Sequence, residues 1–347
     1  MNSSQSHPAL NLLLIALILA GLYIGQNLLI PLVLGLLFWY LINSLRRQIG
    51  LIRIANRALP NWLQIFTAAS VMFGLIWFIV RIVAANLEEL QLVSEAYNQK
   101  LLELSGKISD YLNITSIEEV TKSVDLGKYA ETILESSYGF LTGFFVVLFY
   151  VIFIIAEQSI FKKKLDLVLE DRKQKIQFFR IITQIDDSVH SYLSVKAILS
   201  LVVAIITYIV LISFGVDFAV LWALLTFLLN FIPFIGSLLA ILFPVLLSFL
   251  QFSDPITTLV IGSVLVGNQV LFGNFIEPRM VGKSLNLSPL VVVLALAFWG
   301  ALWGVVGMFL CVPITVTLMI IMSQFPRTRA AAIMLSAGED FVTKKDR

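Results

Sequence analysis

The segment that decides the fold runs from Phe218 to Phe252 and reads FAVLWALLTFLLNFIPFIGSLLAILFPVLLSFLQF. It has 35 residues and no charged side chain. As one continuous helix it would be about 52 Å long, whereas the hydrocarbon core of a bilayer is about 30 Å thick. The segment breaks at NFIPFIG, residues 230–236, because Pro233 removes a backbone donor and Gly236 tolerates unusual dihedral angles.

The break divides the segment into two short halves, 219–231 and 237–250, of 13 and 14 residues. Halves this short favour a re-entrant helical hairpin over two full spans. A second segment, 289–323, repeats the pattern with prolines and glycines at Pro289, Gly300, Gly304, Gly307 and Pro313. The alternative is that both breaks are packing kinks within ordinary spans.

The rest of the chain is also strongly apolar. Hydrophobic residues make up 59% of it and charged residues only 13%, about half the charged fraction of an average soluble protein. This composition excludes the water-soluble class. Further spans are predicted as two short helices folded into a hairpin over 10–45, where Gln26, Asn27 and Pro31 interrupt the apolar run, and as single helices over 62–83, 138–156, 197–214 and 256–273.

The basic residues predict the orientation, since Lys and Arg concentrate in short cytoplasmic loops. With the N-terminus inside, 19 of the 24 basic residues fall on the cytoplasmic side. The loop 46–57 then carries four arginines and no acid, while 86–136 lies outside with ten acids and four lysines. Both termini are therefore expected in the cytoplasm. The first broken segment inserts from outside and the second from inside, an opposed pairing that is typical of the midplane sites of secondary transporters.

The expected fold is an all-α polytopic membrane bundle with two oppositely oriented broken or re-entrant helical hairpins in its C-terminal half. Residues 90–111 have the 3-4 apolar spacing of an amphipathic helix, and Ser116 with Glu119 could cap another. This outer segment is either a structural hairpin or a subunit contact. The predicted organisation is 1–85 (three spans), 86–137 (periplasmic amphipathic segment), 138–196 (one span with cytoplasmic amphipathic helices), 197–323 (transport core with both broken segments) and 324–347 (cytoplasmic tail).

Polar residues near the first break are the candidate substrate site. Amides within a span are costly unless they are paired, so Asn230, Gln269 and Asn274 are expected to face the solute. Backbone groups freed at the break, at Ile232 and Ile235, would assist them. Pro233 and Gly236 would hold the break open.

Three charged residues near the cytoplasmic boundary are candidates for a gate or for ion coupling. They are Glu277, Arg279 and Lys283. The alternative is that they simply lie among the lipid headgroups.

Several functional classes find no support in the composition. A net charge of +2 favours no nucleic-acid partner. One cysteine and two histidines favour neither a metal site nor a bound cofactor. No Gly-x-x-x-x-Gly-Lys-[Ser/Thr] loop is present for ATP, and no catalytic constellation lies inside the spans, so an enzyme is not expected.

The C-terminal motifs resemble the autoinducer-2 exporter family of bacterial inner-membrane transporters. The matching stretches are NFIPFIG (230–236), GNFIEPRMVGK (273–283), Ser288-Pro289 and the glycine-rich stretch that ends at CVP (311–313). The resemblance implies a homo-oligomer, with a pentamer as the expected number, and an elevator-like moving unit. It also implies export of a quorum-sensing furanone or, in some members, sodium/proton antiport. Many relatives have tyrosine where this chain has Phe234, which removes one hydroxyl from the site.

Three functions compete on these grounds. Export of a small polar organic solute leads, because the spans contain very few acids for proton exchange. A monovalent cation (sodium or lithium)/proton antiporter is the alternative. A non-transporting membrane scaffold is third, and two opposed broken hairpins argue against it.

Overall fold

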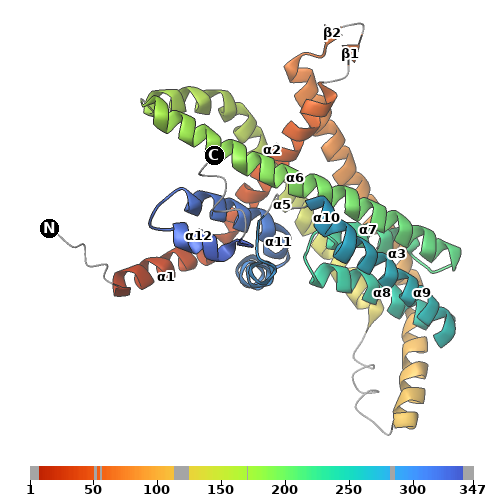
Figure 1. Ribbon diagram of the computed structural model, residues 1–347. Helices are drawn as coiled ribbons and strands as arrows, with labels where there is room; N and C mark the ends of the chain where they lie inside the picture. The colour runs from red at the N-terminus through yellow and green to blue at the C-terminus, as the bar shows by residue number, and fades with distance from the viewer. Residues whose placement is uncertain are drawn as a thin grey trace. The chain divides into compact units, whose positions relative to one another are not determined.

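The computed structural model describes residues 8–50, 53–54, 57–112, 125–169, 171–281 and 286–338 (Figure 1). The helices are α1 (Pro8–Ile24), α2 (Gln26–Ile49), α3 (Asn61–Leu112), α5 (Leu126–Val168), α6 (Arg172–Ser213), α7 (Ala219–Leu229), α8 (Ile235–Phe252), α9 (Pro255–Val270), the π-helix η1 (Leu271–Ile276), α10 (Glu277–Val281), α11 (Pro289–Ser323) and α12 (Arg329–Leu335). Two-residue strands β1 (Arg53–Ile54) and β2 (Arg57–Ala58) pair antiparallel between α2 and α3. The predicted all-α class is confirmed.

The predicted membrane class is confirmed as well. Six helical stretches of the described chain are long and apolar enough to cross a bilayer: Gln26–Ile49, Asn61–Gly106, Arg172–Ser213, Ile235–Phe252, Pro255–Met280 and Pro289–Ser323. Their outer faces carry large exposed apolar side chains such as Trp62, Trp77 and Leu259. Such faces are stable only against lipid or another apolar surface. The chain is a multi-pass membrane protein.

The chain forms two compact units, each built from segments far apart in the sequence. The first comprises Met1–Leu45, Gly143–His190 and Leu285–Arg347, and the second comprises Arg46–Thr142 and Ser191–Ser284. These units group residues that contact one another, whereas the segments expected from the sequence group consecutive residues by the side of the membrane on which they were predicted to lie. The sequential division stays a prediction.

The expected hairpin over residues 10–45 is wrong, because α1 runs into α2 through a bend. Only Gly25 separates the two helices, and the α-helical hydrogen-bond pattern continues on both sides of it. The amide of Gly25 donates to the carbonyl oxygen of Gly21, and that of Leu29 donates to Gly25, each at 2.9 Å. A chain that keeps these bonds cannot reverse at one residue. The carbonyl oxygen of Leu22 instead accepts a hydrogen bond from the indole nitrogen of Trp303 in α11, at 3.1 Å.

Helix α3 joins the predicted span at 62–83 and the predicted amphipathic helix into one element of 52 residues. Within the second unit its far part packs against the chain around α7 and α8. Tyr97 donates its hydroxyl proton to Asp217 at 2.5 Å, and the ammonium of Lys100 donates to the carbonyl oxygen of Gln251 at 2.9 Å. The predicted cap at Ser116 and Glu119 lies outside the described residues.

The first broken segment folds back on itself as α7 and α8. Phe234, between them, has φ 60° and ψ −62°, a backbone conformation that is rare for a residue with a Cβ atom. The two helices then run side by side, and Trp222 of α7 stacks on Phe243 of α8 with ring centroids 6.2 Å apart. The halves are unequal, with 11 residues in α7 and 18 in α8. The second half is thus longer than the sequence suggested.

The second broken segment, α11, folds back at Trp303 and Gly304. Gly304 has φ 60° and ψ −142°. Across the turn, the indole nitrogen of Trp299, which precedes it, lies 3.3 Å from the hydroxyl oxygen of Thr315, which follows it by 11 residues and lies 16 residues after Trp299. These residues would be about 24 Å apart along a straight helix. Re-entry of either hairpin on one side of the bilayer stays a prediction.

Candidate functional site

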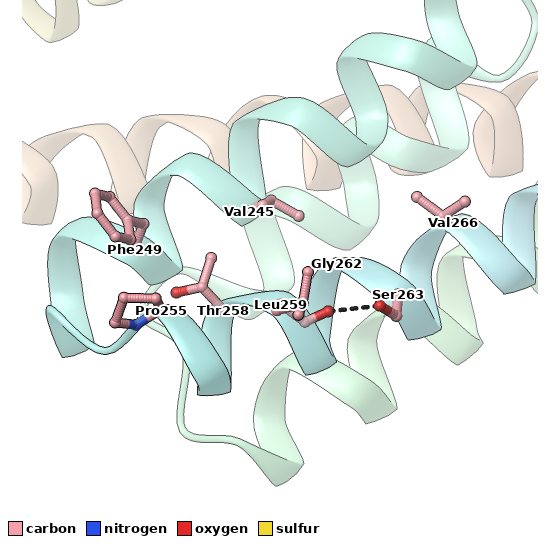
Figure 2. A pocket seen from close by; sticks show the side chains of 8 residues that line it. All are labelled: Val245, Phe249, Pro255, Thr258, Leu259, Gly262, Ser263 and Val266. Atoms are coloured by element: carbon pink, nitrogen blue, oxygen red, sulfur yellow. Dashed lines mark hydrogen bonds between the residues drawn. The ribbon is translucent and has the colours of Figure 1, made fainter. Parts of the chain in front are cut away.

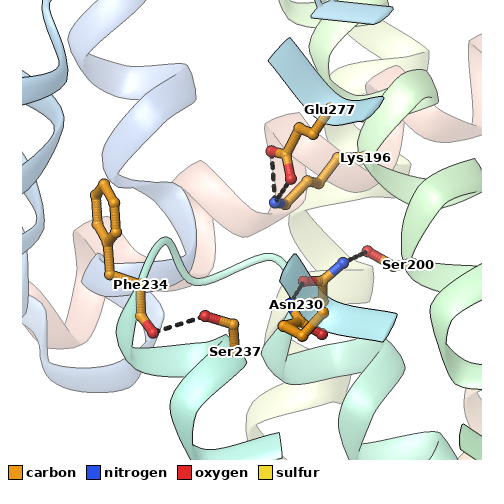
Figure 3. Close-up of polar contacts among 7 residues, drawn as sticks. Lys196, Ser200, Asn230, Phe234, Ser237 and Glu277 are labelled. Carbon is orange, nitrogen blue, oxygen red and sulfur yellow. Dashed lines mark hydrogen bonds and ion pairs between the residues drawn. The ribbon is translucent and has the colours of Figure 1, made fainter. Parts of the chain in front are cut away.

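A polar stripe on α6 organises the candidate site of the second unit. Lys196 and Ser200 are separated by one helical turn, so they lie on the same face of α6. Both are buried, and Ser200 is fully enclosed. Each bonds to a different element of the same unit (Figure 3). Because buried polar groups need partners, this stripe links α6 to the end of α7 and to α10.

Asn230 is the centre of an amide network at the end of α7. Its side-chain nitrogen donates to the hydroxyl of Ser200 at 3.0 Å, and its side-chain oxygen accepts from the amide of Gln269 at 2.9 Å. Asn230 is only 5% exposed. The network thus joins α6, α7 and α9 directly beside the hairpin tip. Each of these two atoms of Asn230 uses one of its two hydrogen-bonding positions, so a solute could bond to the second position or replace an existing contact.

An ion pair lies near this network (Figure 3). The ammonium of Lys196 is 2.6 Å from one carboxylate oxygen of Glu277 and 2.8 Å from the other. The side chain of Lys196 is 6% exposed and that of Glu277 is 22% exposed. Removing one partner of such a pair leaves a buried charge that is strongly unfavourable. The contact joins α6 to α10, immediately after η1, and π-helices are frequent at functional sites.

A neighbouring amide has an unfilled bonding position. Asn268 is buried in α9 and donates its side-chain amide to the carbonyl oxygen of Val203 in α6, at 3.2 Å. Its side-chain oxygen is buried with no partner among the described residues. Val203 lies about one turn beyond Ser200 on α6, so Asn268 contacts α6 next to the polar stripe, and its side-chain oxygen is a buried acceptor there. A buried acceptor of this kind can take a hydrogen bond from a water molecule or a solute hydroxyl.

The other predicted site residues lie outside the buried amide network. Pro233 and Gly236 form the hairpin tip, and Asn274 is exposed on η1 rather than buried with the other amides. Arg279 is exposed on α10, and Lys283 lies outside the described residues. The sequence analysis missed Lys196 and Ser200. An ionisable residue at the start of a predicted span was the available signal for Lys196.

The amides expected to be free at the break are engaged within the tip. The amide of Ile232 donates to the carbonyl oxygen of Leu229 at 2.8 Å, and that of Ile235 donates to Pro233 at 2.6 Å. A solute would therefore have to compete with these bonds for the two amides, and their role in binding stays a prediction. The carbonyl oxygen of Phe234 accepts from the hydroxyl of Ser237 at 2.8 Å (Figure 3). The tip is thus a hydrogen-bonded turn.

A separate groove lies between α8 and α9, and none of its lining residues belongs to the polar network (Figure 2). Its lining is almost wholly apolar: Val245, Phe249, Pro255, Thr258, Leu259, Gly262, Ser263 and Val266. The hydroxyl of Ser263 is already bonded to the carbonyl oxygen of Leu259 at 2.7 Å. A polar solute would find few partners there, so the amide network on α6 is the better candidate site.

Comparison with known proteins identifies relatives over nearly the whole chain. The profile of a family described as "AI-2E family transporter" matches residues 12–327. A protein of Haemophilus influenzae named "Putative transport protein" is 30% identical over 98% of this chain and 99% of its own length. The "AI-2 transport protein TqsA" of Escherichia coli is 28% identical over 93% of each chain. The similarity thus covers both units and both hairpins.

Proposed function

Because this chain belongs to the AI-2E family of transporters, we propose that it exports a small polar organic solute similar to autoinducer-2 across the bacterial inner membrane. The similarity to a relative named for AI-2 transport supports the choice of solute. The amide network of Asn230 and Gln269 is the observation that carries the proposal, since it places hydrogen-bonding groups within apolar helices beside a hairpin tip.

The solute binds, in this proposal, by exchanging with contacts that the protein makes to itself. Asn230 releases Ser200 or Gln269 when a solute hydroxyl offers an equivalent bond, so little hydrogen bonding is lost. Pro233 and Gly236 keep the tip in shape. Asn274, exposed on η1, meets the solute outside the buried network. Glu277, Arg279 and Lys283 lie at the cytoplasmic end of the proposed transport path, where they open or close it to the solute.

The proposed setting is a homo-oligomer, a pentamer by resemblance to the family, with both termini in the cytoplasm. The far part of α3 supports a subunit contact, because Leu92 and Leu102 are exposed apolar residues beyond the expected span. Exposed apolar side chains on this part of α3 are covered most simply by another copy of the chain.

The test is solute flux in proteoliposomes that contain the purified protein. Labelled furanone should leave or enter these vesicles faster than it does protein-free vesicles. Asn230→Leu and Gln269→Leu should each weaken apparent affinity, while Ser263→Ala, in the apolar groove, should not. Wild-type rate and affinity in both amide variants would show that the amides are structural.

A second candidate, monovalent cation/proton antiport, is favoured by one observation. The carboxylate of Glu277 is largely buried and has a charged partner, and acidic residues within membrane segments often mark ion pathways. In this mechanism sodium or lithium replaces the proton or the Lys196 ammonium at Glu277. A sodium-dependent pH change inside the same vesicles, absent in Glu277→Gln, would favour antiport over solute export.

A further inference from the structure

The two partners of the Lys196–Glu277 pair are held very differently. Lys196 projects from the interior of α6, a helix of 42 residues, and is the more buried partner. Glu277 lies in α10, the last five residues of the continuous helical stretch that begins at Pro255 and passes through η1. A π-helix carries an extra residue in its turn, and its conversion to an α-helix shifts everything that follows. Glu277 is therefore the partner that can leave, while Lys196 stays in place.

Departure of Glu277 would leave a buried ammonium without a counter-charge. Such a charge is strongly unfavourable in a low-dielectric interior. Lys196 cannot readily reach water by itself, because only 6% of its side chain is exposed. Another anion in the place of the carboxylate would lower the cost of opening the pair.

We propose that Lys196 binds an anionic group of the transported solute, and that the Glu277 carboxylate occupies this position when the solute is absent. The inference rests on the proposed export function and names the solute class as a small organic anion. The reverse assignment, in which a cation displaces Lys196 from Glu277, requires the more buried partner to leave and the more exposed one to stay.

The neighbouring polar groups suit the rest of such a solute. Ser200 lies one turn from Lys196, about 5–6 Å along α6, and bonds to Asn230. Gln269 completes this row of hydrogen-bonding groups. A molecule with a carboxylate or similar anionic oxygen at one end and a hydroxyl group about 5–6 Å away could contact both Lys196 and the amide network.

The test uses acetate as a probe for the Lys196 position. Full-length protein in detergent is unfolded by heat over a range of sodium acetate concentrations, with sodium chloride at equal ionic strength as the reference. Glu277→Gln removes the carboxylate charge and keeps the side-chain shape, so its Tm should fall below that of wild type. Acetate should raise it saturably, by on the order of a few degrees. Wild type should respond much less, because Glu277 competes with acetate.

Two controls separate this site from general salt effects. Lys196→Met with Glu277→Gln removes both charges and should abolish the acetate response. Glu157→Gln removes the carboxylate of the Lys164–Glu157 pair, which has the same 2.6 Å contact but side chains 62% and 50% exposed. That variant should show no acetate response.

The outcomes are decisive in either direction. If Glu277→Gln does not fold, Glu277→Asp replaces it, since its shorter side chain weakens the pair and should admit acetate. No saturable response in the tested variant, or an equal response in the double variant, overturns the proposal. The ion pair would then have a structural role only. Failure of solute flux in wild-type vesicles would instead overturn the export function, whatever acetate does.

Discussion

Gly236 lies against the carbonyl oxygen of Leu229 so closely that a Cβ atom at position 236 would be 1.7 Å from that oxygen. The same Cβ atom would be 3.1 Å from the Cβ atom of Ile232. No rotamer relieves the first overlap, because both atoms belong to the backbone or are fixed to it. The turn between α7 and α8 therefore requires glycine at this position.

Gly236→Leu should abolish transport. The turn must open to admit any side chain, and that separates α7 from α8 and moves Asn230 relative to Ser200. We expect a loss of stability of about 1–3 kcal/mol or more, visible as a lower Tm in detergent, and flux near that of protein-free vesicles. Gly267→Ala is the matched control, since a Cβ atom there meets nothing within 4 Å. Normal flux in Gly236→Leu would mean that the observed tip is not needed for transport.

The α11 turn offers a comparison between two causes of destabilisation. Gly307→Ala should be the more harmful change, because its Cβ atom would be 1.9 Å from the carbonyl oxygen of Trp299. Gly304→Ala meets open space but strains a backbone with φ 60° and ψ −142°, at a cost of roughly 1–3 kcal/mol. Thermal unfolding measures both, with Gly21→Ala as the unhindered control. A harmless Gly307→Ala would contradict the tight turn.

The topology can be tested by labelling single cysteines in Cys311→Ser protein on whole cells. An impermeant thiol reagent should label Asp110→Cys and leave Arg53→Cys and Asp340→Cys untouched. The reason is the charge distribution, which places the acidic segment outside and most basic residues inside. Labelling after the membrane is permeabilised controls for buried thiols. The reverse pattern would refute both the orientation and the opposed insertion of the two hairpins.

Phe234→Tyr should be tolerated and should strengthen binding of a hydroxyl-rich solute. Phe234 is 58% exposed at the hairpin tip, so the added hydroxyl has room. It adds a hydrogen-bonding group at the tip. The apparent affinity for labelled furanone in proteoliposomes should rise, by up to about tenfold if one net hydrogen bond forms. Phe243→Tyr, in the stack with Trp222, is the control. An unchanged affinity would place the tip away from the solute.

Asp254 should make the start of α9 sensitive to acid. Its pKa is lowered, first by a hydrogen bond from the Thr257 hydroxyl and then by the amides of Thr257 and Ile256. A carboxyl with a lowered pKa in the folded state stabilises the fold above its ordinary pKa, and this effect disappears as pH falls through the lowered value. Asp254→Asn keeps the cap without the charge, so its Tm should depend less on pH below about 4. Equal pH dependence in wild type and variant would exclude this cap as the cause.

The two broken segments could be predicted from the sequence because the residues that cause each break lie within the segment itself. Pro233, Gly236 and Gly304 restrict or permit backbone angles in any context. The length of the apolar runs then predicted where the chain must fold back. The unequal lengths of α7 and α8 were not predictable in this way, since α8 extends two residues beyond the predicted half 237–250 at each end and α7 stops at Leu229.

The polar contacts depended on pairing across elements, which no single segment encodes. Asn230 and Gln269 were identified as polar residues in apolar surroundings, but their bond joins residues 39 apart. Lys196 was grouped with a cytoplasmic segment because its neighbours on the N-terminal side are polar. The bend at Gly25 was mistaken for a hairpin because Gln26, Asn27 and Pro31 resemble turn residues. In the structure Gln26 and Asn27 form the first turn of α2, and Pro31 lies inside that helix without ending it.

The hydrogen bond from Trp303 to the Leu22 carbonyl oxygen gives the first unit a mechanical linkage. The bond joins the bend between α1 and α2 to the residue at which α11 reverses. The two places where the first unit departs from continuous α-helix therefore share one contact, and a backbone change at either place would stretch or break this bond.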